Sequence, residues 1–166
     1  WTAQYYPFHK RRTFITSGGL GTMGFGMGAA IGAAQATGKK TVLFTGDGSF
    51  GMNLNELATA VSQNTPLVIV IMNNNVLGMV RQWQNLFFDK HYSQTTLNRQ
   101  TDFVKLAEAF GARGLRIMNR QELGPVMAEA FAHTGPVVVD VAIDPDAFVL
   151  PMLPPGGSFD DIITEV

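Results

Sequence analysis

Two polar residues of this chain have the types and the spacing needed to hold a divalent cation. Asp47 lies between Gly46 and Gly48, and Asn74 follows it by 27 residues within a run of three asparagines. Each residue comes just after an apolar run, so a carboxylate and an amide oxygen could meet where two strands end. Oxygen ligands of this kind suit Mg²⁺, which usually also keeps phosphate oxygens and water. The pair therefore indicates a site that grips a diphosphate through Mg²⁺.

The segments around this pair predict a β-α-β unit. Residues 41–45 form a short β-rich run, and residues 67–72 are continuously apolar, as expected for a strand buried on both faces. Between them, apolar residues recur at helical spacing: Leu54, Leu57, Ala58 and Val61. The two strands of such a unit are parallel, so Asp47 and Asn74 should both lie at their carboxyl ends. Ligands of open α/β sheets bind at that edge.

The start of the intervening helix carries a further signal. Asn53 is a favourable N-cap residue, and Glu56 three positions later predicts a variant of the capping box.

The remaining segments continue the same alternation. We predict a helix over residues 102–110 that Gly111 and Gly114 stop, and a short strand over residues 115–117. A helix over residues 121–134, with Pro125 in its first turn, and a buried strand over residues 136–143 follow. The expected fold is α/β, a doubly wound, mostly parallel sheet with helices on both faces. Residues 1–150 would form this domain, and residues 151–166 an extended, mobile tail.

Residues 18–32 contain seven glycines mixed with alanine and methionine. Such a run is a poor helix by intrinsic propensity, and close approach of the backbone to a ligand, then of a helix to the sheet, would explain it. A glycine-rich loop leading into a tightly packed helix, without a ligand, is the alternative.

Composition excludes several classes of function. With 166 residues, 46% hydrophobic and 15% charged, the chain is expected to be one globular domain. A net charge of −1 and the lack of a Lys/Arg block favour neither nucleic acid nor an anionic membrane. No apolar stretch reaches the roughly 20 residues of a membrane span. The absence of cysteine excludes disulfides and thiolate metal sites.

Each half of the cation signal is weak alone, because Asp between glycines and Asn after a strand both commonly make turns. Their combination with two strands and a helix is more specific. The segment from Gly46 to Asn74 resembles the thiamine diphosphate (ThDP) motif, which begins with Gly-Asp-Gly and closes with Asn-Asn. Residues 1–4, 13–24, 78–84 and 150–157 are also similar to the catalytic subunit of biosynthetic acetohydroxyacid synthase (acetolactate synthase). The resemblance covers nearly the whole chain.

The resemblance implies roles for individual residues. The side chains of Asp47 and Asn74 and the backbone carbonyl of Val76 would bind Mg²⁺, and the N–H groups of Gly48 and Ser49 are plausible phosphate donors. The implied cofactor-binding set is Gly21, Met23, Gly46, Asp47, Gly48, Ser49, Asn74, Gly78 and Met79.

Three residues are implied to act in catalysis: Met23, Met79 and Trp83. Met23 would support the bent conformation of ThDP, and Trp83 would line the substrate channel, where its bulk favours 2-oxobutyrate as acceptor. Read from the residues alone, Met23 is an ordinary core methionine and Trp83 a core aromatic on an amphipathic helix.

Two positions depart from the family pattern. Gly28 stands where proline is usual, and Asn75 where glycine or an acidic residue is common. Neither departure touches the metal pair.

The implied activity is the condensation of two pyruvates, or of pyruvate and 2-oxobutyrate, with release of CO₂. The cofactors would be ThDP and Mg²⁺, with FAD in the full-length protein. The resemblance also implies a glutamate on another domain that activates the cofactor, so this piece alone would be inactive. We expect a homodimer or homotetramer, a possible small regulatory subunit, and a cytoplasmic (bacterial) or organellar location if a transit peptide was removed. A pyruvate oxidase, a 2-oxoacid decarboxylase and a non-catalytic partner-binding module are the alternatives.

Overall fold

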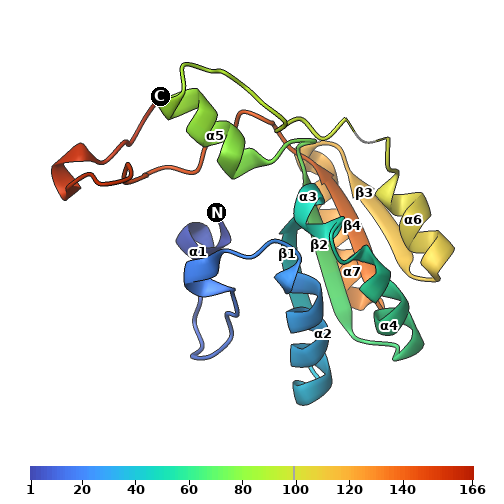
Figure 1. The fold of residues 1–166 in the computed structure, drawn as a ribbon. Coiled ribbons are helices and arrows are strands. Elements are labelled where there is room, and N and C mark those ends of the chain that lie inside the picture. Colours follow the sequence, from blue (N-terminus) through green and yellow to red (C-terminus); the bar gives the residue numbers. More distant parts are fainter. Residues whose placement is uncertain (99) are drawn as a thin grey trace.

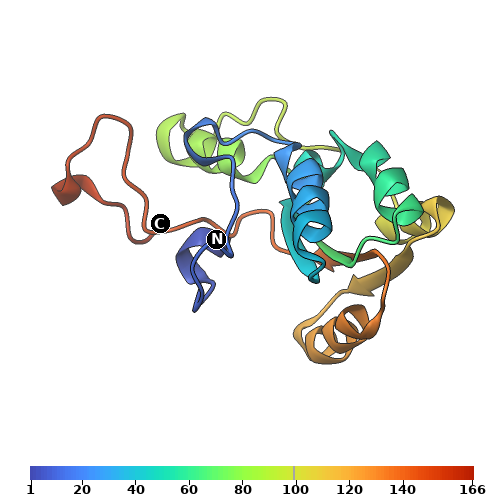
Figure 2. The same cartoon turned by 90° about the horizontal axis from the view of Figure 1, so that it is seen from below.

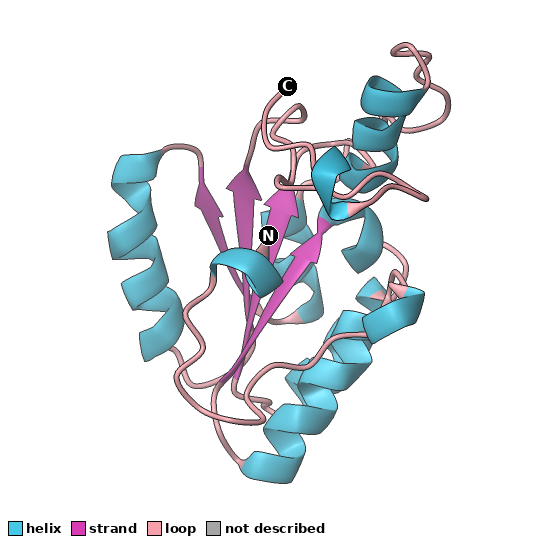
Figure 3. Cartoon of the chain, turned by 90° about the vertical axis from the view of Figure 1, so that its left-hand side faces the viewer, coloured by secondary structure: helices cyan, strands magenta, loops and turns pink. Residues whose placement is uncertain are grey.

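The computed structural model describes residues 1–98 and 100–166 and contains a sheet of four parallel strands (Figure 3). The strands stand in the order β1-β2-β4-β3. Their bounds are Thr41–Gly46 for β1, Leu67–Asn73 for β2, Arg113–Ile117 for β3 and Val137–Ala142 for β4. The two central strands are almost wholly buried, which explains why their sequences are continuously apolar rather than alternating.

Helices cover both faces of the sheet, which confirms the doubly wound α/β fold (Figure 1). On one face, α2 (Phe25–Thr37), α4 (Leu57–Ser62) and α6 (Phe103–Phe110) pack against alternate residues of the strands, including Leu43, Ile69 and Val138. On the other face, α7 (Leu123–Ala132) packs against the remaining alternate residues, including Val68 and Val139.

Helix α2 forms despite its glycines because it packs closely on β1. A Cβ atom added at Gly26 would lie 2.7 Å from Cδ1 of Leu43, so the absence of a side chain lets the helix approach the strand. This confirms the helix-to-sheet half of the expectation for residues 18–32. Gly28 lies in the first turn of α2, where an added Cβ would meet open space.

Helix α6 begins and ends as predicted. The Asp102 carboxylate accepts hydrogen bonds from the N–H groups of Val104 and Lys105, and Gly111 closes the helix with a left-handed φ of 88°. Gly114, however, does not stop this helix. It lies inside β3, where an added Cβ would be 2.7 Å from the carbonyl oxygen of Val104, and it lets α6 pack on the sheet.

The expected capping box at Asn53 and Glu56 is wrong. Asn53 precedes a short 3₁₀ helix, η2 (Leu54–Glu56), and its side chain makes no capping hydrogen bond. The amide of Asn53 donates instead to the carbonyl oxygen of Gly24, at 3.0 Å, while the Glu56 carboxylate accepts from Asn55 and Thr59. A tertiary hydrogen bond has thus replaced the local one.

Other boundaries differ by a few residues. The helix expected over residues 121–134 is shorter, because Asn119 caps a separate 3₁₀ helix, η3 (Arg120–Glu122), before α7 starts. Pro125 lies in the first turn of α7, as predicted. The remaining short helices are α1 (Thr2–Tyr5), η1 (Gly18–Leu20), α3 (Asp47–Phe50) and η4 (Phe159–Asp161).

The N-terminal segment and the C-terminal tail lie on one side of the sheet, away from α6 (Figures 1 and 2). The Tyr5 hydroxyl donates to the carbonyl oxygen of Leu150 at 2.7 Å, and the Gln4 amide donates to that of Pro151 at 3.3 Å. The N-terminal segment therefore contacts the chain where the C-terminal tail begins. In the described part of the chain, no helix combines the length and apolar character that crossing a membrane requires.

Candidate functional site

Asp47 and Asn74 lie at the same edge of the sheet, as the sequence predicts. Gly46, the last residue of β1, pairs with Met72 of the neighbouring parallel strand β2. Asp47 then begins α3, and Asn74 follows the last residue of β2. Only 2% of the surface of Asp47 is exposed. A buried carboxylate and an amide thus follow adjacent strands at their carboxyl ends, where open α/β sheets bind ligands.

The turn that carries Asn74 is held by hydrogen bonds on both sides. The Oδ1 atom of Asn74 accepts from the N–H of Val76 at 3.2 Å, and Asn75 has a left-handed φ of 57°. The N–H of Leu97 donates to the carbonyl oxygen of Asn75, and Val76 forms an antiparallel bridge with Thr96. Asn tolerates this φ better than most residues. Glycine would adopt this φ without strain.

Two glycines allow close packing around this turn. A Cβ atom at Gly78, the first residue of α5 (Gly78–Phe87), would lie 3.1 Å from Nδ2 of Asn74. At Gly48 it would lie 2.8 Å from Cδ2 of Leu77 and 3.4 Å from Cε of Met23. The structure therefore brings Met23, Gly48 and the Asn74–Gly78 turn together. At both positions these close contacts leave no space for a side chain, which explains the glycines.

Met23 is positioned by two hydrogen bonds of Gly24, the residue that follows it. The N–H of Gly24 donates to Oγ of Ser49 at 3.0 Å, while its carbonyl oxygen accepts from the amide of Asn53. Gly24 has a φ of 85°, and an added Cβ would lie 3.2 Å from Cβ of Met52. Ser49 and Asn53 thus attach the glycine-rich loop to the segment that follows Asp47.

The three residues implied in catalysis are not core residues. Met23 is 37% exposed, Met79 48% and Trp83 43%. Trp83 lines a hollow along α5 together with Val80 and other residues up to His91. This exposure excludes the interpretation of Met23 and Trp83 as ordinary core side chains. Of the implied cofactor-binding glycines, Gly21 is exposed with a φ of 56°, and Gly46 is exposed at the end of β1.

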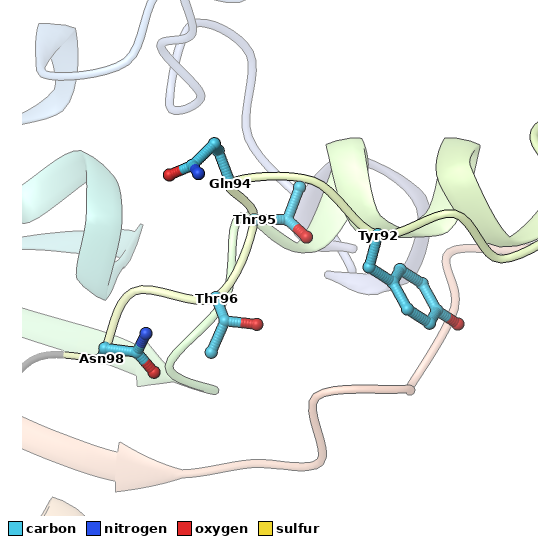
Figure 4. Close-up of a pocket in the computed structure, with 5 residues that line it drawn as sticks. All are labelled: Tyr92, Gln94, Thr95, Thr96 and Asn98. Carbon is cyan, nitrogen blue, oxygen red and sulfur yellow. The ribbon is translucent and has the colours of Figure 1, made fainter.

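A second, polar hollow includes Thr96, the bridge partner of Val76 in the Asn74 turn. Figure 4 shows the side chains that line it, all from the segment that follows α5: Tyr92, Gln94, Thr95, Thr96 and Asn98. None of them is charged at neutral pH. Within this hollow Thr95 is 1% exposed and donates to the Oε1 atom of Gln84, so part of the lining is fixed to α5.

The donor set fits a magnesium–diphosphate group better than an all-protein metal site. Among the described residues no cluster of three His, Cys, Asp or Glu side chains could hold a metal ion. The edge offers one carboxylate, one amide oxygen and backbone carbonyls instead, with glycines at positions 46, 48 and 78. Mg²⁺ needs only one or two carboxylates when substrate or cofactor phosphates complete its octahedron.

Sequence reasoning missed a charged network beside this edge. Nδ2 of Asn73 donates to Oδ1 of Asp140 at 2.9 Å, and Nε of Arg116 donates to Oδ2 of Asp140 at 3.2 Å. Arg116 also reaches Asp102 at 2.5 Å. Burial alone would lower the pKa of Arg116, but the hydrogen bonds and charges of Asp102 and Asp140 outweigh it and raise that pKa. The signal in the sequence was a single carboxylate, Asp140, inside an otherwise apolar strand.

Gln82 was missed as well. It is 1% exposed on the otherwise solvated helix α5. Its amide donates to the carbonyl oxygen of Val149 at 3.0 Å, and its Oε1 atom accepts from the N–H of Val149 at 2.8 Å. This two-way contact attaches the segment just before the tail to α5, the helix that also carries Met79 and Trp83.

The chain is similar to several acetolactate synthases. Over 165 residues, 98% of this chain, it is 47% identical to the mitochondrial catalytic subunit of Saccharomyces cerevisiae acetolactate synthase. It is 44% identical over its whole length to the large subunit of Escherichia coli isozyme 2, and 42% identical over 99% of its length to a chloroplastic enzyme of Nicotiana tabacum. The chain spans 24%, 30% and 26% of these relatives.

A solved structure confirms the fold. The thiamine diphosphate-dependent 4-hydroxybenzoylformate decarboxylase of Rhodococcus jostii matches 75% of this chain with a TM-score of 0.70 and 28% identity, over 24% of its own chain. The family profile for thiamine pyrophosphate enzymes, C-terminal TPP binding domain, matches residues 1–141. That range contains the Asp47–Asn74 edge and the glycines around it, and the chain belongs to this family of C-terminal thiamine pyrophosphate-binding domains.

Proposed function

We propose that this chain is the cofactor-binding domain of an acetolactate synthase, which condenses two pyruvates, or pyruvate and 2-oxobutyrate, and releases CO₂. The observation that carries the proposal is the meeting of Asp47 and Asn74 at one sheet edge. The sequence identity of 42 to 47% to acetolactate synthases along nearly the whole chain supports the choice of reaction.

We propose the following roles for the residues of the site. The Asp47 carboxylate, the Asn74 amide oxygen and the Val76 carbonyl hold Mg²⁺, which binds the diphosphate of ThDP. The N–H groups of Gly48 and Ser49 lie in the first turn of α3, where helix amides lack partners within the helix, and donate to phosphate oxygens. Bound ThDP supplies the electron sink on which the decarboxylation of 2-oxoacids depends.

The remaining cofactor contacts come from the loops around this edge. Met23 packs beside Gly48 and supports the cofactor, and Gly21, Gly46 and Gly78 leave room for it. Met79 and Trp83 line the approach of the substrate, with Trp83 favouring 2-oxobutyrate as acceptor. The half-exposed side chains of Met23, Met79 and Trp83 support this assignment, because they leave apolar surface free to contact a ligand.

The proposal extends to the complete protein. FAD, the activating glutamate, a homodimer or homotetramer and a small regulatory subunit would be features of the full-length enzyme, since this chain spans at most 30% of the relatives named above. Residues 1–150 would be the ThDP domain and residues 151–166 a tail. The location would be the bacterial cytoplasm or an organelle; relatives include mitochondrial and chloroplastic proteins.

The structural similarity to a decarboxylase favours one competing reaction. A 2-oxoacid decarboxylase would use the same metal edge but release a free aldehyde. Product analysis of the full-length protein with pyruvate, ThDP, Mg²⁺ and FAD separates the two: we expect acetolactate, and acetaldehyde as the main product would replace our proposal with the decarboxylase.

The cofactor site is tested by titrating ThDP into wild-type protein and into Asp47→Ala, each with Mg²⁺ and with EDTA. We expect Mg²⁺-dependent binding in the wild type and none in the variant, because Asp47 is the only carboxylate of the proposed ligand set. The circular dichroism spectra of the two proteins should coincide. Equal ThDP affinity in both proteins would refute the metal assignment.

A further inference from the structure

A row of polar side chains crosses three adjacent strands just inside the cofactor edge. Arg116 lies on β3, Asp140 on β4 and Asn73 on β2, and β4 stands between the other two in the sheet. Arg116 pairs with Asp140 in the register of the strands, and Asp140 pairs with Ile71, two residues before Asn73. Because alternate residues share a face, Asn73 lies on the same side of β2 as Ile71.

The row is continuous from α6 to the Asn74 turn. Asp102 caps α6 and contacts Arg116 at 2.5 Å, and Arg116 contacts Asp140 at 3.2 Å. Asp140 accepts the amide hydrogen bond of Asn73 at 2.9 Å. Asn73 is also held through its backbone, because its carbonyl oxygen accepts from the N–H of Ile143 at 3.0 Å. The last residue of β2 is thus fixed to β4 at two points.

Asp140 is unusual among the acidic side chains of this chain. It is 5% exposed, within a strand that is otherwise valine and alanine. A buried carboxylate is costly unless it is paired and hydrogen-bonded, and packing alone would favour an apolar residue at this position. Its oxygens divide their roles: Oδ2 accepts from the guanidinium and Oδ1 from the amide of Asn73. This division gives the carboxylate a function in orienting Asn73.

We propose that Asp140, held by Arg116, is a positioning residue for the metal edge, because it fixes Asn73 and thereby the neighbouring ligand Asn74. Asn74 follows Asn73 directly at the end of β2, so a change in the backbone of Asn73 would shift the Asn74 amide as well. This inference rests on the proposed function, since it assigns Asp140 and Arg116 to the same Mg²⁺–ThDP site. Residues that orient metal ligands typically change metal affinity 10- to 100-fold when they are replaced.

The test compares Asp140→Asn with wild type in the full-length protein. Asparagine keeps the size of the side chain and an oxygen for Asn73, but its NH₂ group faces the Arg116 guanidinium, so two donors meet. ThDP binding is measured by calorimetry over a series of MgCl₂ concentrations. We expect the Mg²⁺ concentration for half-maximal ThDP binding to rise about tenfold, with wild-type stoichiometry restored at high Mg²⁺.

Arg113→Gln is the matched control. Arg113 lies at the other end of β3 and pairs with Glu129 at 2.6 Å, on the surface. Like Arg116→Gln, this substitution removes a positive charge from β3, but it does not touch the row, so its Mg²⁺ midpoint should stay within about twofold of wild type. An equal shift in Arg113→Gln would show a general effect of charge and overturn the inference.

The other outcomes are equally decisive. A lower stoichiometry of ThDP binding to Asp140→Asn without a changed Mg²⁺ midpoint would show a merely structural role and overturn the inference.

If Asp140→Asn does not fold, the same titration is made with Arg116→Gln, because Arg116 is partly exposed. We expect its Mg²⁺ midpoint to rise at least about threefold. An unchanged midpoint overturns the inference. Wild-type protein that binds no ThDP with Mg²⁺ would refute the proposed function, and this inference with it. Wild-type binding with unchanged midpoints in the variants would refute the inference alone.

Discussion

Replacing Gly114 by alanine should destabilise the domain strongly, although it adds one methyl group. Gly114 is buried in β3, beneath the first turn of α6. The new Cβ would lie 2.7 Å from the carbonyl oxygen of Val104, 2.9 Å from its Cγ1 and 3.1 Å from its Cα. Carbon–oxygen contacts in proteins lie at about 3.3–3.6 Å, so the start of α6 would have to move by roughly 0.6 Å or more.

The size of the effect follows from what blocks the methyl group. Overpacking a core costs about 1–3 kcal/mol, and here the obstacle includes helix backbone, which cannot change rotamer. We therefore expect a loss of about 2–3 kcal/mol in the free energy of unfolding. For a chain of this size that corresponds to a fall of roughly 4–12 °C in Tm, measurable by thermal and urea unfolding followed by circular dichroism.

Gly28→Ala is the control for this prediction. Gly28 lies in α2, and an added Cβ would meet nothing within 4 Å. The substitution should raise stability by about 0.5–1 kcal/mol, because alanine favours the helix. If Gly114→Ala were as stable as wild type, or if both variants changed stability in the same direction, the argument from close approach would be refuted.

Two further predictions concern the tail and the N-terminus of α6. Gln82→Leu removes both hydrogen bonds to Val149, at about 1 kcal/mol each, so hydrogen exchange of the Val149 amide should accelerate about 30-fold. Gln4→Ala removes a single exposed hydrogen bond and should change this exchange rate far less. Equal exchange rates in the two variants would contradict the role of Gln82. The hydrogen bond from the Lys105 backbone, together with Arg116, lowers the pKa of Asp102 below its ordinary value of 3.8. The stability that this carboxylate contributes is therefore present above that ordinary value and is lost as the pH falls through the lowered one. Asp102→Asn should accordingly flatten the acid end of the stability–pH curve below about pH 4, and an unchanged curve would exclude Asp102 as a contributor.

Local patterns in the sequence determined most of the architecture. The continuous apolar runs identify β2 and β4, because a strand buried on both faces has no polar side. The short β-rich run over residues 41–45 identifies β1. The caps of α6 at Asp102 and Gly111 were readable for a similar reason: a cap is a contact within one turn of the chain. The order of elements then required parallel strands, which alone placed Asp47 and Asn74 at one edge.

Tertiary structure decided the features that depend on contacts between distant residues. Asn53 has the sequence of an N-cap, but a hydrogen bond to Gly24 takes its side chain. Gly114 reads as a helix stop, yet it serves the packing of α6 on β3. Gln82 reads as a surface residue until Val149, 67 positions later, is found beside it.

The polar row shows this division most clearly. The sequence displays Asp140 as a lone carboxylate in an apolar strand, but its partners Asn73 and Arg116 lie 67 and 24 residues away. Only the strand order, with β4 inserted between β2 and β3, brings the three together. Periodicity and turn chemistry are properties of neighbouring residues, whereas pairing across a sheet depends on which strands become adjacent. The sequence by itself therefore determined the elements and the arrival of Asp47 and Asn74 at one sheet edge, and the tertiary structure decided the contacts that hold that edge in place.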